Sequence, residues 1–277
     1  MSGAMVRTVI VGASGRMGQH LIRLLPQYAP LQLVGAIVSV GSQALGRDAF
    51  GIAGLKPPAG RTAVPCSADL AAVLQQGADL VIDFSSHVGA AASVAACRAA
   101  RVPLLMCTTG WGAEVQQALA AASAEIPVLV AANTSLGVNV LVELVRQAAA
   151  MLPAGFDIEI VEAHHGGKRD APSGTALALG RAAAEGRNLA LDAVAVAGRQ
   201  GLSGPRTPGE IGFASVRGGD VVGEHEVHFL GSQERLRFCH SATDRAVFAR
   251  GALAAGRWLA GQKPGAYRMA DMLKVSC

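Results

Sequence analysis

The chain has 277 residues, of which 51% are hydrophobic and 16% charged, so it can bury the cores of two domains and is not intrinsically disordered. Its formal charge of +4 comes from 24 basic and 20 acidic residues, and aromatic residues make up only 4%. Without a long basic run or many aromatic residues, the composition favours small anionic ligands over nucleic acid, and no apolar stretch is long enough to predict a membrane span.

The first half of the chain alternates apolar runs with helical stretches. The runs that we predict to be strands are 6–11, 31–38, 79–84, 103–107 and 127–131. Helices are predicted directly after the first strand and then over 68–76, 87–101 and 113–125, whereas the Gly- and Pro-rich stretch 41–60 is predicted to be a loop. Because apolar strands alternate with helices, we expect an α/β fold with a parallel, Rossmann-type sheet that helices cover on both faces.

The pattern changes after about Asn133. A helix is predicted over 138–151, and polar residues then alternate with apolar ones in four runs: 156–162, 211–216, 222–230 and 234–240. In the last run, Leu236 and Phe238 alternate with Arg235 and Arg237. A period of two is typical of strands with one face in water, so we expect a mixed or antiparallel sheet of three or four strands with helices on one side. Residues 199–209 are predicted to be a loop and 244–261 a last helix.

A glycine-rich turn lies between the first predicted strand and its helix. Its sequence is Gly12-Ala13-Ser14-Gly15-Arg16-Met17-Gly18. Glycines let the backbone approach a pyrophosphate, and the N-terminus of a helix offers N–H groups and a partial positive charge, so this turn predicts a dinucleotide site. The same pattern also fits a strand-to-helix turn that binds nothing.

The end of the second strand bears on which dinucleotide is bound. A site for NAD usually has an acidic residue there, whereas this chain has Val38-Ser39. A carboxylate would repel the 2′-phosphate of NADP, and Arg16 lies near the glycine turn. We therefore expect NADPH to be used at least as well as NADH, although Arg16 also fits the role of a solvated surface residue.

A second motif contains groups that transfer protons and bind anions. It reads Glu162-Ala163-His164-His165-Gly166-Gly167-Lys168-Arg169-Asp170-Ala171-Pro172-Ser173-Gly174-Thr175 and precedes a helix predicted over 176–185. Imidazole exchanges a proton near neutral pH, an ammonium group donates a proton or holds an anion, and a Ser-Gly-Thr helix start offers N–H groups and hydroxyls to a carboxylate. The alternatives are a surface histidine pair, a plain helix cap and a zinc site. Neighbouring histidines on a strand point apart and neither a Cys nor a third His is close in sequence, so no metal is expected.

Five cysteines are scattered along the chain and form no Cys-x-x-Cys pair. They are Cys66, Cys97, Cys107, Cys239 and Cys277. An odd and scattered set argues against a disulfide framework, and the first residues lack the long apolar core of a signal peptide. We therefore expect a cytoplasmic protein.

The second motif resembles the signature of the 4-hydroxy-tetrahydrodipicolinate reductase (dihydrodipicolinate reductase) family. The chain matches it at Glu162 to His165, at Lys168 and at Asp170 to Ala176. Supporting matches along the rest of the chain are Asp83-Phe84-Ser85, Thr108-Thr109-Gly110, Ala132-Asn133, Gly137-Val138-Asn139, Ile211-Gly212-Phe213 and Gly223-Glu224-His225. The resemblance implies NADPH- or NADH-dependent reduction of a cyclic imine dicarboxylate, with loss of water, in lysine and diaminopimelate biosynthesis.

The resemblance also implies a role for each matching position. His164 corresponds to the catalytic proton donor and acceptor, and Lys168 to a second proton donor. The expected substrate contacts are His165, Ser173, Gly174 and Thr175. The expected dinucleotide contacts are Gly12, Ala13, Ser14, Gly15, Arg16, Met17, Gly18, Cys107, Thr108, Thr109, Ala131, Ala132, Asn133 and Thr134. A homotetramer built through the second sheet is implied as well.

We accordingly expect a dinucleotide-binding domain at 1–132, a domain for substrate binding and oligomerisation at 133–246, and a C-terminal helical segment, 247–277, that returns to the first domain. Three positions depart from the family pattern: Val38-Ser39 stands where Glu-Arg or Asp-Arg is common, Cys107 where a Gly is usual, and Thr134 where an aromatic residue is common. Two other functions remain open, a reductase of another amino or keto acid and a dinucleotide sensor without catalysis. The intact proton-donor motif favours the dicarboxylate reductase.

Overall fold

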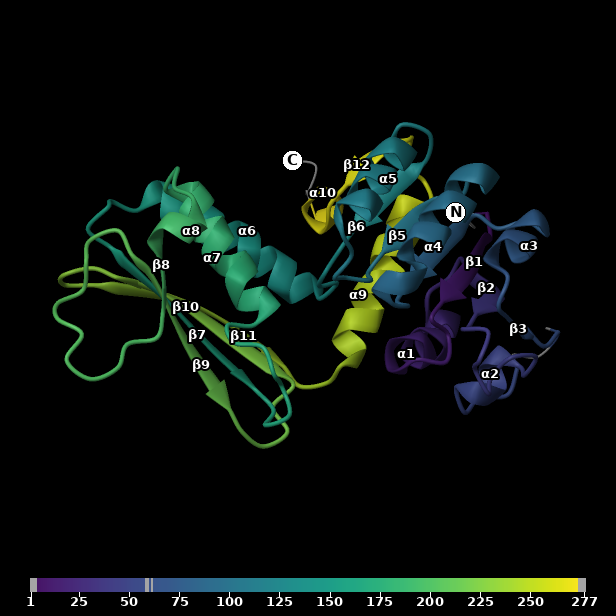
Figure 1. The fold of residues 1–277 in the computed structure, drawn as a ribbon, viewed down its shortest axis with the longest axis horizontal. Coiled ribbons are helices and arrows are strands. Elements are labelled where there is room, and N and C mark those ends of the chain that lie inside the picture. Colours follow the sequence, from purple (N-terminus) through teal and green to yellow (C-terminus); the bar gives the residue numbers. More distant parts are fainter. Residues whose placement is uncertain (1–3, 58–59, 61, 274–277) are drawn as a thin grey trace. The chain divides into compact units, whose positions relative to one another are not determined.

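The computed structural model describes residues 4–57, 60 and 62–273. The chain divides into two compact units, of which the first combines Met1–Ser135 with Ala246–Cys277 and the second is Leu136–Arg245 (Figure 1). The described part of the chain contains no helix that is both long and apolar enough to cross a membrane. The described cysteines are free thiols, and Cys277 lies outside the described residues.

A seven-stranded sheet forms the centre of the first unit. In spatial order its strands are β12 (Gly265–Tyr267), β6 (Pro127–Val130), β5 (Leu104–Met106), β4 (Leu80–Asp83), β1 (Val6–Val11), β2 (Leu31–Ile37) and β3 (Cys66–Ser67). Each neighbouring pair is parallel, which confirms the expected Rossmann-type sheet. The carboxyl ends of adjacent parallel strands meet at one edge, where such folds bind their ligands.

Helices cover both faces of this sheet, as the apolar strands predicted. They are α1 (Arg16–Leu24), the short 3-10 helix η1 (Leu25–Gln27), α2 (Ala49–Ile52), α3 (Leu70–Gln75), α4 (His87–Ala100), α5 (Ala113–Ser123), α9 (Ala246–Leu259) and α10 (Met269–Leu273). Ile10 of β1 belongs to the apolar cluster with residues of α1 and α9, whereas its neighbours Val9 and Val11 belong to the cluster with residues of α4 and α5. Although α9 follows the second unit in sequence, it packs against α1 in the first.

Several short elements of the first unit were not predicted. The stretch expected to be a loop contains the one-turn helix α2, whose first turn is capped by a 3.0 Å hydrogen bond from Gly51 N to Asp48 Oδ2. The strands β3 and β12 and the helix α10 were also missed. These elements have two to five residues, too few to show a hydrophobic period.

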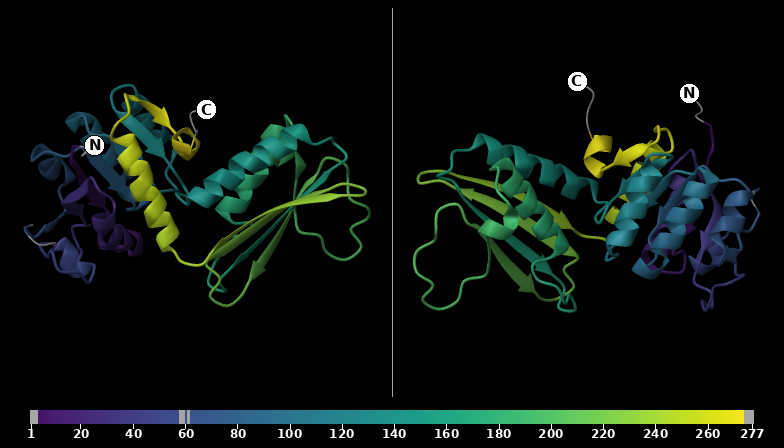
Figure 2. Two further views of the ribbon diagram at one scale, coloured as in Figure 1. Left: turned by 180° about the vertical axis from the view of Figure 1, so that it is seen from behind. Right: turned by 45° about the horizontal axis from the view of Figure 1, so that its top comes forward.

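The second unit is a five-stranded mixed sheet. Its helices lie on one face of the sheet (Figure 2). The strand order is β11 (Arg235–Ala242), β10 (Gly223–Leu230), β7 (Asp157–His164), β9 (Ile211–Arg217) and β8 (Ala195–Ala197). The helices are α6 (Leu136–Met151), α7 (Gly174–Gly186) and the short α8 (Leu191–Val194). Strand β7 is antiparallel to β10 and parallel to β9, so the prediction of a mixed sheet is confirmed.

Two details of this sheet correct the sequence analysis. The sheet has five strands rather than three or four, because the three-residue β8 is too short to show an alternating pattern. On the edge strand β11 the expected alternation of burial holds from Phe238 onwards, and Phe238 packs edge-on against Phe229, but Leu236 near the start of the strand is 38% exposed. Helix cover is incomplete at this edge, so an apolar residue there stays in contact with water.

Candidate active site

Glu162 is a buried carboxylate in the middle of the second unit. On β7 the residues that face the helices are Ile158, Ile160 and then Glu162, which is only 1% exposed. An acidic side chain in this apolar row requires partners, because an unpaired charge away from water is strongly destabilising.

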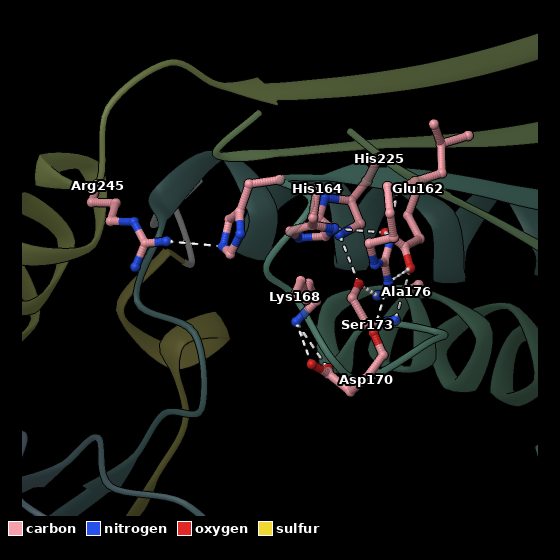
Figure 3. Close-up of polar contacts among 11 residues, drawn as sticks. Glu162, His164, Lys168, Asp170, Ser173, Ala176, His225 and Arg245 are labelled. Atoms are coloured by element: carbon pink, nitrogen blue, oxygen red, sulfur yellow. Dashed lines mark hydrogen bonds and ion pairs between the residues drawn. The ribbon is translucent and has the colours of Figure 1, made fainter. Parts of the chain in front are cut away.

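The partners are Arg217, Ser215, His164 and the backbone of Ser173, and Figure 3 shows His164 and Ser173 beside Glu162. Arg217 donates from Nη1 to Oε2 and from Nη2 to Oε1, each over 2.7 Å. The backbone N–H of Ser173 donates to Oε1 over 3.1 Å, and His164 Nδ1 lies 2.6 Å from Oε2. Burial alone would raise the pKa of Glu162, but hydrogen bonds from Arg217, Ser215, His164 and Ser173 outweigh it and bring the pKa to about 2. Glu162 is therefore a carboxylate at any working pH.

His164 stands at the end of β7, with its side chain 11% exposed. The ring of His225 meets it edge-on, with the ring centroids 5.1 Å apart and the planes at 76°. Burial lowers the pKa of His164, and although Glu162 raises it, the positive charges of Lys168 and Arg217 lower it further. The net pKa is below the usual value for histidine, so the imidazole is mainly neutral at pH 7 and can accept a proton.

The N-terminus of α7 lies beside these groups. Ser173 caps the helix, since its Oγ accepts a 3.1 Å hydrogen bond from Ala176 N, and the same Oγ lies 3.0 Å from His225 Nε2. The first turn of α7 has no acidic residue, and the space next to Gly174 is open, since a Cβ there would have no atom within 4 Å. Half-buried Thr175 follows. The helix start thus offers N–H groups and a partial positive charge to an anion.

Lys168 lies beside the cluster that contains His164 and Ser173 (Figure 3). Its Nζ is 2.9 Å from both carboxylate oxygens of Asp170, whose side chain is 62% exposed. The ammonium charge contributes to lowering the pKa of both His164 and His225. The cluster therefore combines a cation, a neutral imidazole and a helix N-terminus.

His165 points away from this cluster, as expected for adjacent residues on a strand. Its Nε2 lies 3.1 Å from Nη2 of Arg245, and because arginine only donates, Nε2 accepts. The structure therefore brings His164, Lys168 and the Ser173–Thr175 turn together, and places His165 apart from them. Among the described residues no cluster of three or more His, Cys, Asp or Glu side chains is arranged to hold a metal ion.

Three residues of the cluster were missing from the predicted site residues: Glu162, Arg217 and His225. Glu162 had a signal in the sequence, because it interrupts the apolar positions of a predicted strand. The other two come from distant strands, where register pairs His164 with Arg217 and Glu162 with His225. No pattern within a single strand reveals such pairs.

In the first unit, the glycine turn has a packing reason of its own. Gly12 has φ +81°, and a Cβ there would lie 2.6 Å from the carbonyl oxygen of Phe84; a Cβ at Gly18 would lie 2.2 Å from the carbonyl oxygen of Gly12. The turn also fits a phosphate, because Gly15, the N-cap of α1, provides no side-chain cap and the first turn of the helix has no acidic residue. Arg16 is exposed at this position.

The other expected dinucleotide contacts follow β5 and β6, at the sheet edge where the glycine turn follows β1. The side chain of Thr108 is turned inward, with Oγ1 donating to Asp83 Oδ1 over 3.0 Å, and the preceding residue, Cys107, is also buried. Thr134 is also buried and donates to the carbonyl oxygen of Phe248 over 2.6 Å. Both threonines therefore shape this edge from inside the fold. Asp83, which anchors Thr108, was not among the predicted site residues.

Sequence comparison identifies the family. A profile described as "Dihydrodipicolinate reductase, N-terminus" matches residues 6–134, and one described as "Dihydrodipicolinate reductase, C-terminus" matches residues 137–273. The chain belongs to the dihydrodipicolinate reductase family. The 4-hydroxy-tetrahydrodipicolinate reductase of Anaeromyxobacter dehalogenans strain 2CP-1 is 48% identical over 270 residues, which cover 97% of this chain and 98% of the relative. That of Parvibaculum lavamentivorans is 47% identical, covering 98% of each chain. The expected family is thus confirmed.

Solved structures confirm the fold of this dihydrodipicolinate reductase family member. A dipicolinate-bound dihydrodipicolinate reductase from Paenisporosarcina sp. TG-14 superposes with a TM-score of 0.75 at 23% identity, covering 96% of this chain and 98% of that one. A scyllo-inositol dehydrogenase from Lactobacillus casei, solved with NAD(H) and scyllo-inositol, gives a TM-score of 0.59 at 14% identity and covers 98% of this chain and 93% of that one.

Proposed function

We propose that the segment from Glu162 to Thr175 binds and protonates the substrate of a 4-hydroxy-tetrahydrodipicolinate reductase reaction. The activity itself follows from family membership and from 47–48% identity over nearly the whole chain to reductases of that name. It makes the chain an oxidoreductase of lysine and diaminopimelate biosynthesis. The observation that carries the residue roles is the joining of His164, Lys168 and the N-terminus of α7 in one cluster.

The substrate is a dianion with a ring that must receive one hydride and one proton while water leaves. The backbone N–H groups of Gly174 and Thr175 and the hydroxyls of Ser173 and Thr175 bind one carboxylate. The ammonium of Lys168 binds negative charge on the substrate and is the second proton donor, beside His164. His164 takes up or delivers the proton at its free ring nitrogen. Such groups act by orienting the substrate and by stabilising charge that develops in the transition state. His165, which points away from the cluster, is proposed to contact the other end of the substrate.

The cofactor is proposed to bind at the edge of the parallel sheet. NADPH or NADH supplies the hydride when bound. The uncapped N-terminus of α1 receives the pyrophosphate, and the backbone at 107–109 and 131–134 lines the same edge. NADPH is used at least as well as NADH, because exposed Ser39 follows β2 where an acidic residue would repel a 2′-phosphate, and because Arg16 is exposed at the glycine turn.

One steady-state assay tests both the reductase activity and the cofactor preference. Enzymatically generated 4-hydroxy-tetrahydrodipicolinate is supplied with NADPH or with NADH, and oxidation of the nicotinamide is followed. The expected result is turnover with a KM for NADPH no higher than that for NADH. Absence of turnover with either cofactor contradicts the activity, whereas a KM for NADPH tenfold above that for NADH contradicts only the cofactor preference.

The second unit is also proposed to build a homotetramer through the open face of its sheet. Alternation on β9 turns Ala214 and Val216 away from the helices, and register places them beside Val161 and Ala163 of β7. These four aliphatic residues form a contiguous patch on a face otherwise rich in charge, which we call the sheet patch. Val216 is 55% exposed. An apolar patch of this kind suits self-association about a two-fold axis.

A further inference from the structure

The carboxylate of Glu162 joins two parts of the proposed site. One oxygen, Oε2, lies 2.6 Å from His164 Nδ1, and the other, Oε1, accepts a 3.1 Å hydrogen bond from the backbone N–H of Ser173, the cap of α7. We propose that Glu162 is a positioning residue: it holds His164 with a proton on Nδ1, so that Nε2 exchanges the proton with the substrate, and it fixes the start of α7 relative to that atom. The inference rests on the proposed role of His164.

The chemistry of the contact selects the tautomer. An ionised carboxylate only accepts hydrogen bonds, and the pKa of about 2 keeps Glu162 ionised. At 2.6 Å, the ring nitrogen that faces it must therefore carry the hydrogen. A neutral imidazole has one N–H, so its lone pair then lies on Nε2. The opposite tautomer would direct two lone pairs at each other.

Arg217 keeps the carboxylate in one orientation. Its two terminal nitrogens each donate to a different oxygen of Glu162 over 2.7 Å, and Nη2 also donates to the carbonyl oxygen of Asp170 over 2.7 Å. A bidentate pair of this type adds geometric specificity to its energy. Rotation of the Glu162 side chain would break contacts to β9, to His164 and to α7 together.

The surroundings of the imidazole leave room at Nε2. A Cβ at Gly223 would lie 3.1 Å from His164 Nε2 and 3.4 Å from Cδ2, so the glycine on β10 avoids crowding that edge of the ring. His225, on the same strand, packs edge-on against the ring and has its own Nε2 3.0 Å from Ser173 Oγ. The ring is thus held by β10 on one side and by Glu162 at Nδ1.

The charges around His164 predict what Glu162→Gln does. The groups that act on its proton are Glu162, Lys168 and Arg217, and His225 is the neighbouring ring. Removal of the one negative charge leaves two positive ones, so the pKa of His164 falls further. The amide can also turn its NH2 group to Nδ1, which moves the proton to Nε2. A wrong tautomer of a catalytic histidine is costly, and we expect kcat to fall by at least about 100-fold.

The first measurement needs no substrate. In ¹⁵N spectra of histidine-labelled protein, with the His164 signals assigned by their loss in His164→Gln, the wild type is expected to carry its neutral-state proton on Nδ1. Glu162→Gln is expected to shift the proton towards Nε2. A wild-type His164 with its proton on Nε2 overturns the inference, whatever the activity.

The second measurement separates positioning from folding. Glu159→Gln is the matched control, because Glu159 lies on the same strand and pairs with Arg199 and Arg206 at 3.0 and 2.9 Å, outside the proposed site. Glu162→Gln is expected to lower kcat, to leave the KM for NADPH unchanged and to move the His164 limb of the pH profile to lower pH. Glu159→Gln is expected to change none of these. Equal losses in both variants, with unchanged pH profiles, overturn the inference.

Two further variants cover the remaining outcomes. If Glu162→Gln does not fold, Glu162→Asp keeps an acceptor-only group and is expected to retain the Nδ1 proton with an intermediate kcat; full kcat with the proton on Nε2 overturns the inference. The variant His164→Gln is expected to lose most of kcat. If it keeps kcat while the wild-type tautomer is as expected, the proposed role of His164 fails, and the catalytic part of the inference fails with it.

Discussion

Lys168 is paired with Asp170, and we expect a substrate carboxylate to replace that partner. Its ion pair with Asp170 is partly exposed to water, and surface pairs of this kind contribute at most about 1 kcal/mol to stability. Lys168→Ala should therefore leave folding almost unchanged. It should lower kcat/KM by more than about 100-fold, roughly 3 kcal/mol of transition-state stabilisation, because a buried substrate carboxylate or developing charge loses its cation.

Steady-state kinetics with a thermal melt checks this prediction. Lys56→Ala is the matched control, since Lys56 is exposed in the first unit. This variant should keep the kcat/KM and the melting temperature of the wild type. A loss of tenfold or less in Lys168→Ala would contradict the proposed catalytic role of Lys168. A large drop in melting temperature would instead mean that the Asp170 pair is structural.

Sequence reasoning grouped the residues that are proposed to transfer protons, but it did not find the residues that hold them. His164, Lys168 and Ser173 lie within ten residues of one another, so one motif contains them all. Arg217 and His225 become neighbours of this motif only through strand register. A buried charge network of this kind needs partners from several strands, and such pairing is a property of the folded sheet.

Strand β10 contains a histidine that makes the second unit sensitive to acid. Burial, aided by the charges of His164, His240 and Lys168 and opposed by Glu162, lowers the pKa of His225 to about 4, from 6.5 when unfolded. Between these values the unfolded state binds more protons, so stability is complete above pH 6.5 and is lost as the pH falls towards 4. The shift corresponds to on the order of 3 kcal/mol. Glu162 adds a loss in the same direction between pH 4.5 and about 2.

Hydrogen exchange of the β10 amides, corrected for the intrinsic effect of pH, measures this contribution. When the pH is lowered from 7.5 to 4.5, the free energy of opening of the wild type should fall by most of the roughly 3 kcal/mol that the shift in the pKa of His225 contributes. His225→Asn should start lower but lose much less over the same interval. His228→Asn is the control, because His228 is on the same strand and one-quarter exposed, and it should behave as the wild type. An equal pH dependence in His225→Asn and the wild type would contradict the assignment.

At the level of elements, prediction succeeded where a period could be counted. The six-residue β1 and the eight-residue β10 show clear apolar patterns, and both lie where they were predicted. The three-residue β8 and β12 and the two-residue β3 have no countable period, and they form because a neighbouring strand offers unpaired backbone groups. Short edge strands are therefore consequences of the sheet rather than of their own sequence.

For the whole molecule, the open face of the five-stranded sheet decides the expected assembly. Val216 lies in the sheet patch with Val161, Ala163 and Ala214, and two copies of the patch can bury each other about a two-fold axis. Val216→Asp would place two carboxylates in that contact without water, which is unfavourable unless they are paired.

We therefore expect light scattering after size exclusion to give the mass of a tetramer for the wild type and a smaller species for Val216→Asp. Val88→Asp, on the exposed surface of α4, should remain a tetramer because Val88 is 80% exposed and lies in the other unit. A monomeric wild type, or a tetrameric Val216→Asp, would show that the sheet patch does not hold the subunits together.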